Sequence, residues 1–188
     1  MYISSIYVII IYGTRRYENR RIILMEDESM ILYHGSNVEI KNPELNHSRI
    51  ALDFGPCFYT TSDFDQAKRW AVRVSKIRES ETPIVSVFEI DQDILNGLSI
   101  LRFEKADSGW LKTVVGFRID HPIAQGYDII TGPVANDRTV DVINQFIAGT
   151  FPEDIALRLL LPMQFKDQWT FKTQKAISAL LYREAIRL

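Results

Sequence analysis

The order of short strands and amphipathic helices is the feature that most constrains how this chain folds. Short runs of apolar, aromatic or β-branched residues predict strands, and apolar residues spaced three and four apart predict helices. The predicted strands are 30–33, 54–61, 83–90, 127–131 and 168–171, and the predicted helices are 62–76, 137–148, 152–161 and 173–187, with 110–117 compatible with either. Because these elements interleave irregularly, with long loops between the early strands, the sequence predicts an α+β fold rather than a repeated βαβ winding.

Length and composition indicate one globular domain. A chain of 188 residues with 46% hydrophobic residues can bury a sizeable core. Its formal net charge of -2 gives no basic field of the kind that attracts nucleic acids. Cys57 is the only cysteine, so it has no disulfide partner within the chain, which fits a reducing, cytoplasmic location. No glycine-rich phosphate-binding motif occurs, so a nucleotide would have to be held in another way.

The first 29 residues differ in pattern from the rest. Residues 6–12 form an apolar run far shorter than the roughly 20 residues that span a bilayer, so no membrane association is expected. Arginines follow this run, whereas a signal peptide carries its positive charges first. We therefore expect an extension over residues 1–29, outside a single domain of residues 30–188. An added edge strand and a partner-binding arm are the alternatives.

Three separated fragments carry side chains suited to ligand binding. His34 follows the first predicted strand, and the next residue, Gly35, lacks a Cβ and so permits a planar ligand to approach its backbone. Tyr59 can stack on a heteroaromatic ligand. Gln168 places a polar group at the head of the last predicted strand. Taken singly, such fragments are more often structural: a strand-end turn, a core aromatic residue and an exposed strand terminus.

In this order the three fragments resemble the ADP-ribosyltransferase superfamily, in its diphtheria-toxin and poly-ADP-ribose-polymerase branch. That branch is marked by a His-Gly on the first strand, a Tyr on the second and a Glu on a late strand. Residues 30–180 are also similar to a small bacterial family catalogued as a domain of unknown function, whose members are often encoded beside a short partner protein. The resemblance implies an ADP-ribosyltransferase-like split β-sheet with surrounding helices.

The resemblance also implies roles for individual residues. His34 would bind the adenosine ribose of NAD, and the Gly35 backbone would hold the nicotinamide carboxamide. Tyr59 would stack on the nicotinamide ring, and Gln168 would reach the nicotinamide ribose. Ser36 is expected beside the cofactor, and Arg49 is a candidate contact for its phosphates, although it reads equally well as a solvated loop residue.

Gln168 departs from the family pattern, because the family uses a glutamate at this place. A glutamine accepts a hydrogen bond from a ribose hydroxyl but offers neither negative charge nor a general base. Asp128 and Asp137 are possible substitute acids, and Arg138 is a possible accessory residue at the cleft mouth. Asn136 or Asp137 can equally be the cap of the following helix. A Gln168→Glu variant is expected to cleave NAD equally well or faster.

The resulting hypothesis is an NAD-dependent mono-ADP-ribosyltransferase, as the toxin of a bacterial toxin–antitoxin pair, with a small antitoxin-like protein as partner. NAD is its substrate, and no metal is expected because the histidines are too scattered for a metal motif. The alternatives are an inactive NAD-binding or protein-interaction module and an NAD glycohydrolase. Asp53-Phe54-Gly55 matches the magnesium-binding triplet of protein kinases, but without the companion motifs it is interpreted as a chance match. Cys57 is expected to be a small buried residue.

Overall fold

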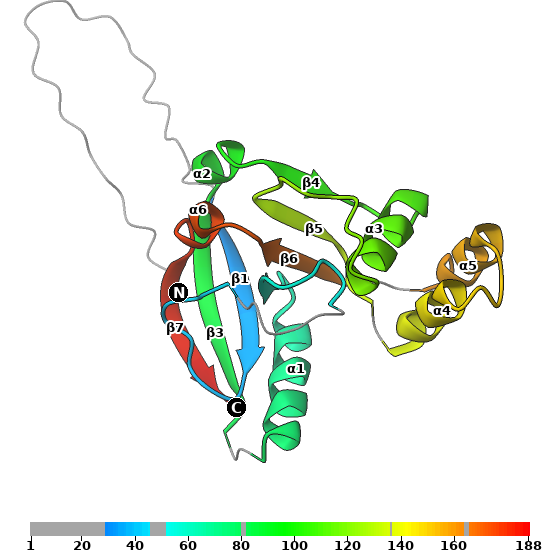
Figure 1. Cartoon of the computed structure of the whole chain (residues 1–188). Coiled ribbons are helices and arrows are strands. Elements are labelled where there is room, and N and C mark those ends of the chain that lie inside the picture. The colour runs from blue at the N-terminus through cyan, green and yellow to red at the C-terminus, as the bar shows by residue number, and fades with distance from the viewer. Residues whose placement is uncertain (1–28, 46–51, 80–81, 136, 164–165) are drawn as a thin grey trace, which may run out of the picture.

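The computed structural model describes residues 29–45, 52–79, 82–135, 137–163 and 166–188, and of Asp137 and Arg138 only the backbone. In this part of the chain, six helices and seven strands form one domain with two sheets (Figure 1). The fold is therefore mixed in helix and sheet, as the pattern predicts. The expected extension lies outside the described residues except for Ser29, where the first strand begins.

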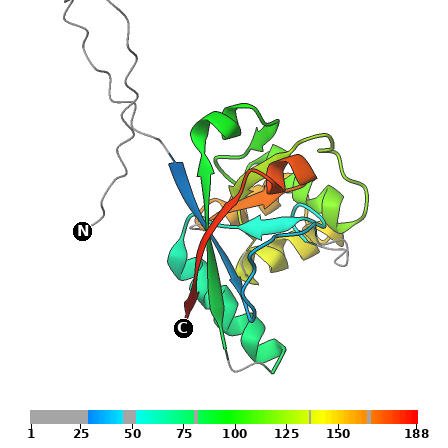
Figure 2. The ribbon, with the colours of Figure 1, turned by 90° about the vertical axis from the view of Figure 1, so that its left-hand side faces the viewer.

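The first sheet contains long strands paired along their whole length. β1 (Ser29–Ser36), β3 (Ile84–Asp91) and β7 (Leu181–Arg187) pair antiparallel in the order β1-β3-β7. Helix α1 (Phe64–Ile77) lies alongside this sheet (Figure 2). The side chain of Asp63 caps α1 by accepting a hydrogen bond from the Gln66 N–H at 2.9 Å, and the predicted cap Ser62 lies one residue earlier.

The second sheet is built from short strands in the order β2-β6-β5-β4. These strands are β2 (Phe58–Thr60), β6 (Asp167–Phe171), β5 (Ile129–Pro133) and β4 (Ile100–Arg102), and only the β4–β5 pair is parallel. The remaining helices are α2 (Gln92–Asn96), α3 (Ser108–Arg118), α4 (Asp137–Ile147), α5 (Glu153–Leu160) and α6 (Gln174–Ile177). An isolated bridge between Tyr33 of β1 and Thr61, the residue after β2, connects the two sheets.

Apolar packing among the described residues occurs in three clusters. The first includes Leu32 and Phe88 from one sheet and Phe58 and Phe171 from the other, so it holds the sheets together. The second, around Trp110, covers the other face of the second sheet with α3, α4 and α5. The third joins α1 to the first sheet. The junction between β1 and β2 therefore lies where two separately packed layers meet.

Two predicted boundaries near the site are wrong. The first strand does not end before His34: β1 runs through His34, Gly35 and Ser36, because β3 pairs with it as far as Ser36 opposite Ile84. The second strand is shorter than predicted. Residues 54–57 form a turn in which Gly55 has φ of 80°, and β2 begins only at Phe58.

The largest error concerns the C-terminal segment, predicted as a helix over 173–187. Helix α6 ends at Ile177, and residues from Leu181 onward form β7. A bulge opposite the Val87/Phe88 step leaves Tyr182 in the inter-sheet cluster and Ile186 in the α1 cluster. The bulge breaks the alternation of a regular strand, so the apolar spacing imitates a helix. The prediction also omitted β4 and α2, and the ambiguous 110–117 segment is helical, in α3.

Candidate functional site

His34 links the two sheets. Its Nδ1–H donates a hydrogen bond to the Tyr59 carbonyl oxygen at 2.7 Å, and its ring stacks on Phe58 with centroids 4.6 Å apart. Because a carbonyl only accepts, the proton lies on Nδ1 in this arrangement and Nε2 keeps its lone pair. Burial lowers the pKa of His34 below its ordinary 6.5, more than the bond to Tyr59 raises it. The imidazole is therefore neutral at pH 7, with Nε2 ready to accept.

Gly35 lies where β1 and β2 separate. The bridge between Tyr33 and Thr61 consists of two backbone hydrogen bonds, 2.8 and 3.0 Å, so the N–H and C=O of Tyr33 point away from β3. Alternation along the strand directs the N–H and C=O of Gly35 the same way. An antiparallel continuation would pair Gly35 with Tyr59, but no such bridge forms. Among the described residues, the two backbone groups of buried Gly35 have no hydrogen-bond partner.

The reason for a glycine at position 35 is helix packing. A Cβ here would stand 2.1 Å from the Ala67 carbonyl oxygen and 2.9 Å from the Ala71 nitrogen, both in the backbone of α1. The space freed by the missing side chain is thus filled by the helix, not left open for a ligand as the sequence suggested. The neighbouring Ser36 is also buried, at 6% exposure.

Tyr59 is held at both ends. Its backbone pairs with Thr170 of β6, and its carbonyl oxygen accepts from His34. Its hydroxyl donates to the Gly55 carbonyl at 2.7 Å and accepts from the Phe54 N–H at 3.1 Å. Burial raises the pKa of Tyr59 well above its ordinary value of 10.0. The residue is therefore a neutral phenol that fixes the turn before β2.

Gln168 lies on the same face of the second sheet as Tyr59. Tyr59 pairs with Thr170, and residues two apart on β6 project to one face. The Gln168 Nε2 donates to Asp53 Oδ2 and to the Pro133 carbonyl, each at 3.2 Å. Only 4% of the residue is exposed, so it is not the exposed strand end that its sequence position suggests. The polar tips of Gln168 and Tyr59 thus contact consecutive residues of one turn.

Two residues that the sequence analysis missed complete this network. Asp53 is buried at 7% exposure and pairs with Arg118 of α3, Oδ1 to Nη2, at 2.6 Å. Its Oδ2 accepts from the Ala135 N–H at 2.9 Å as well as from Gln168. The kinase-like triplet that contains Asp53 is unrelated to this role, which depends on the pair with Arg118. No local pattern connects it to Arg118, which lies 65 residues away.

The structure thus brings His34, Gly35 and Tyr59 to one junction and sets Gln168 on the Tyr59 face of β6. Other candidates are not brought to it. Asp128 lies at the opposite end of β5 from the Gln168 partner Gly132, and it accepts from the Thr173 hydroxyl at 2.6 Å and the Ser99 N–H at 3.0 Å. These hydrogen bonds lower its pKa and give it a structural role. Arg49, Asn136 and the side chains of Asp137 and Arg138 lie outside the described residues.

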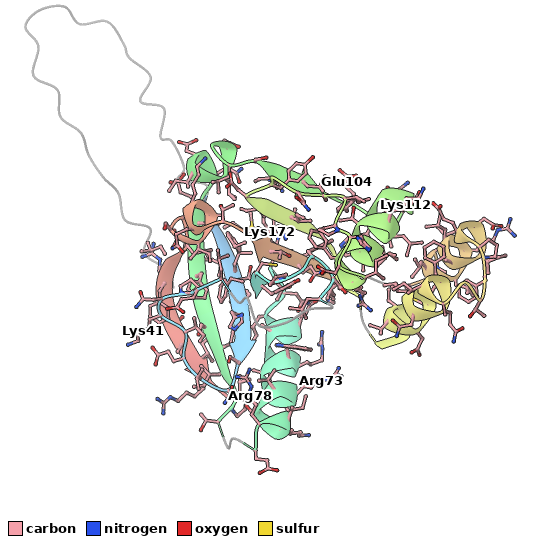
Figure 3. The ribbon with its side chains drawn as sticks, viewed as in Figure 1. Lys41, Arg73, Arg78, Glu104, Lys112 and Lys172 are labelled. Atoms are coloured by element: carbon pink, nitrogen blue, oxygen red, sulfur yellow. The ribbon has the colours of Figure 1, made fainter. Side chains whose placement is uncertain are left out.

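Cys57 and Lys172 border the same turn. The Cys57 thiol is buried, as expected, and donates to the Gly55 carbonyl at 2.9 Å; burial raises its pKa to about 11. Lys172, near the middle of the molecule, follows β6 and donates to the Phe54 carbonyl at 2.6 Å (Figure 3). Its ammonium stands 4.2 Å from the centroid of the Phe117 ring, and burial lowers its pKa. Both residues therefore stabilise the turn.

The described part of the chain contains neither a cluster of metal-binding side chains nor a helix that could cross a membrane. No group of three or more His, Cys, Asp or Glu side chains is placed to hold a metal ion there. Every helix in that part is too short or too polar to cross a bilayer. The junction itself presents uncharged hydrogen-bonding groups and lies near the buried Asp53–Arg118 pair.

Comparison with known protein families shows which family this chain belongs to. A family described as protein of unknown function (DUF3990) matches residues 30–182. The chain belongs to this family. The DUF3990 match runs from β1 into β7, so it contains His34, Tyr59, Gln168 and the missed pair Asp53 and Arg118. The resemblance to a domain of unknown function is thereby confirmed. No curated protein matches the chain.

Proposed function

We propose that this DUF3990 domain binds NAD at the junction of β1 and β2 and transfers ADP-ribose from it to a single acceptor. The observation that carries the proposal is the separation of the two strands beyond the Tyr33–Thr61 bridge. Among the residues that the structure describes, it leaves the N–H and C=O of Gly35 without partners opposite Tyr59. Unpaired buried backbone groups cost free energy, so a ligand that pairs with both would bind favourably there.

A primary carboxamide is the complement of these two groups. Its carbonyl accepts from the Gly35 N–H while its NH₂ donates to the Gly35 C=O. Nicotinamide carries such a group on a flat heteroaromatic ring, which suits a neighbouring tyrosine ring. The neutral Nε2 of His34 supplies an acceptor for a ribose hydroxyl. These features support NAD over nucleotides that lack a carboxamide.

Cleavage of the bond between nicotinamide and ribose requires little proton transfer. The bonding pair leaves with the nicotinamide nitrogen, and the ribose carbon passes through an oxocarbenium-like state, as in glycoside hydrolysis. An acceptor then donates a lone pair to that carbon and loses its proton. The residues of the junction serve to hold the leaving group flat and to orient the ribose, and such positioning lowers the barrier without a metal. Gln168 offers its amide oxygen to a ribose hydroxyl.

Calorimetric titration of NAD into the wild type and into His34→Ala and Tyr59→Phe proteins tests the binding step. We expect a loss of affinity of about tenfold or more for His34→Ala, the size of one lost hydrogen bond to a buried partner. Tyr59→Phe keeps the ring and is expected to retain most of the affinity. His121→Ala, at an exposed site, is the matched control. No measurable binding to the wild type would refute the proposal.

Labelled NAD incubated with the protein and a bacterial lysate then separates the reactions. Label on a macromolecule supports the transferase. Free nicotinamide without a labelled product indicates a glycohydrolase, and binding without either product indicates an inactive NAD-binding module. The full engagement of the Gln168 amide N–H groups favours slow turnover, so long incubations are needed. Growth arrest on expression, relieved by a neighbouring gene, would support a toxin held by an antitoxin-like partner.

A further inference from the structure

The orientation of the Gln168 amide is decided by its neighbours. Its nitrogen faces the Asp53 carboxylate and the Pro133 carbonyl, each at 3.2 Å. Both neighbours are acceptors only. Turning the amide over would place its oxygen against two acceptors and leave its N–H groups without them. The oxygen therefore points away from Asp53. The oxygen has no hydrogen-bond partner among the described residues. It is also not one of the fully buried side-chain atoms that lack a partner.

Asp53 is itself fixed from three sides. Arg118 binds one carboxylate oxygen at 2.6 Å, and the Ala135 N–H and Gln168 bind the other. The side chains of Asp53 and Arg118 are only 9% and 12% exposed. A buried ion pair with several hydrogen bonds is costly to rearrange, because removing either partner leaves a buried charge unpaired. The carboxylate is thus a rigid support for the amide in front of it.

We propose that Asp53 is the positioning residue for Gln168: it bears the negative charge next to the nicotinamide ribose and turns the neutral amide so that its oxygen meets the ribose hydroxyl. This inference rests on the proposed function. It explains why position 168 holds a glutamine. A glutamate there would place a second carboxylate about 3.2 Å from Asp53 and from the Pro133 carbonyl, with no donor between them.

The inference reverses the expectation for Gln168→Glu. Like charges at this separation raise the pKa of one carboxyl group and strain the turn. We expect nicotinamide release by Gln168→Glu to fall about tenfold or more, with the loss in kcat rather than in KM. Asp53→Asn is expected to lose a similar factor. Its amide cannot satisfy Arg118 and Gln168 together, so Gln168 is free to turn over.

The exchange of the two groups is the decisive variant. In Asp53→Asn/Gln168→Glu the carboxylate and the amide trade places, and the hydrogen bond between them reverses direction. We expect nicotinamide release to recover at least about threefold over either single variant, because interacting residues are not additive. Recovery stays partial, since the Pro133 carbonyl still faces residue 168. Asp91→Asn removes a charge at the α2 cap, where asparagine caps equally well, and should leave the rate unchanged.

Thermal unfolding measured from about pH 5 to about pH 8 gives a second readout that needs no NAD. The melting temperature of Gln168→Glu should fall relative to wild type as pH rises, because two carboxylates become charged together. The double variant should not show this fall. If the wild type neither binds nor cleaves NAD, the proposed function is wrong, and the melting profiles still decide the pairing. If NAD is cleaved but Gln168→Glu works as fast as wild type, or the exchange rescues nothing, the inference is overturned.

Discussion

The strands β1 and β6 supply opposite ends of the proposed site, and they hold their residues by different means. β1 belongs to a sheet of long strands, and Gly35 is set by close contact with the α1 backbone. β6 belongs to a sheet of short strands, and Gln168 is set by hydrogen bonds to a buried ion pair. His34 connects the two sides through one hydrogen bond to Tyr59. The position of the β1 half of the site thus depends on close packing, and that of the β6 half depends on charge and hydrogen bonding.

This difference matters for how each half tolerates change. Close-packed backbone has no room for an added methyl group, because interiors are packed at the density of organic crystals. A buried polar network has space for small changes in volume but no additional hydrogen-bond partners. Removing one donor or acceptor therefore leaves a buried polar group unpaired and destabilises the network. The comparison predicts that added volume damages the β1 half and that lost polarity damages the β6 half.

The largest effect is expected for Gly35→Ala. The new methyl group would meet the Ala67 carbonyl oxygen at 2.1 Å, and a helix backbone cannot yield as a side chain can. We expect a loss of more than about 3 kcal/mol in the free energy of unfolding, above the usual range for overpacking. Urea denaturation measures it. Gly97→Ala, where the nearest atom stands at 3.4 Å, is the control and should cost less than about 1 kcal/mol.

Removing the buried ion pair comes next. Arg118→Met keeps the length of the side chain but leaves the Asp53 carboxylate buried without its cation. We expect a loss of about 3 kcal/mol, in line with other broken buried pairs. Arg158→Met breaks the exposed Asp154–Arg158 pair on α5 and should cost less than about 0.5 kcal/mol. Equal losses in the two variants would mean that the Asp53 network does not support the β6 half.

A smaller effect tests the connection between the halves. His34 has a folded-state pKa below its ordinary 6.5, so the folded protein binds fewer protons there than the unfolded chain. Its contribution to stability is complete above about pH 6.5 and is lost as pH falls toward the lower folded value. His34→Asn keeps a donor for the Tyr59 carbonyl but does not titrate. The wild type should therefore lose stability relative to this variant below about pH 6.5; parallel melting curves would contradict the assignment.

The smallest effect concerns the reactivity of the Cys57 thiol, which is measured on the wild-type protein. Cys57 has a pKa of about 11, against an ordinary 9.0, and is buried under the turn of residues 54–57. At about pH 8 its thiolate fraction is about 100-fold below that of a free thiol, and a disulfide reagent should react at least that much more slowly. Full reactivity should return in denaturant. Fast labelling of the native protein would show that the turn opens without global unfolding.

The strongly patterned elements could be predicted from the sequence. The predicted strand 83–90 overlaps β3 at residues 84–90, the capped amphipathic run after residue 62 overlaps α1, and 168–171 is most of β6. In each, the apolar period coincides with one continuous buried face, so local pattern and tertiary packing agree. The candidate residues His34, Tyr59 and Gln168 stand out in the sequence because each is a polar or aromatic residue in or next to a predicted strand, although the strand boundaries there differ from the prediction.

The remaining features depend on partners that are distant in the chain. The apolar pattern of β7 predicts a helix because a bulge against β3 shifts the alternation, and only the pairing with β3 produces that bulge. The hydrogen bond from His34 to Tyr59 spans 25 residues, and the contact between Gln168 and Asp53 spans 115. Propensity and period describe neighbours along the chain and carry no information about such contacts. The sequence by itself therefore determined which elements form and which polar residues stand out. Only the tertiary structure decided that Gly35 makes room for a helix and that Asp53 fixes the amide of Gln168, because close contact and hydrogen bonding are set by distance in space.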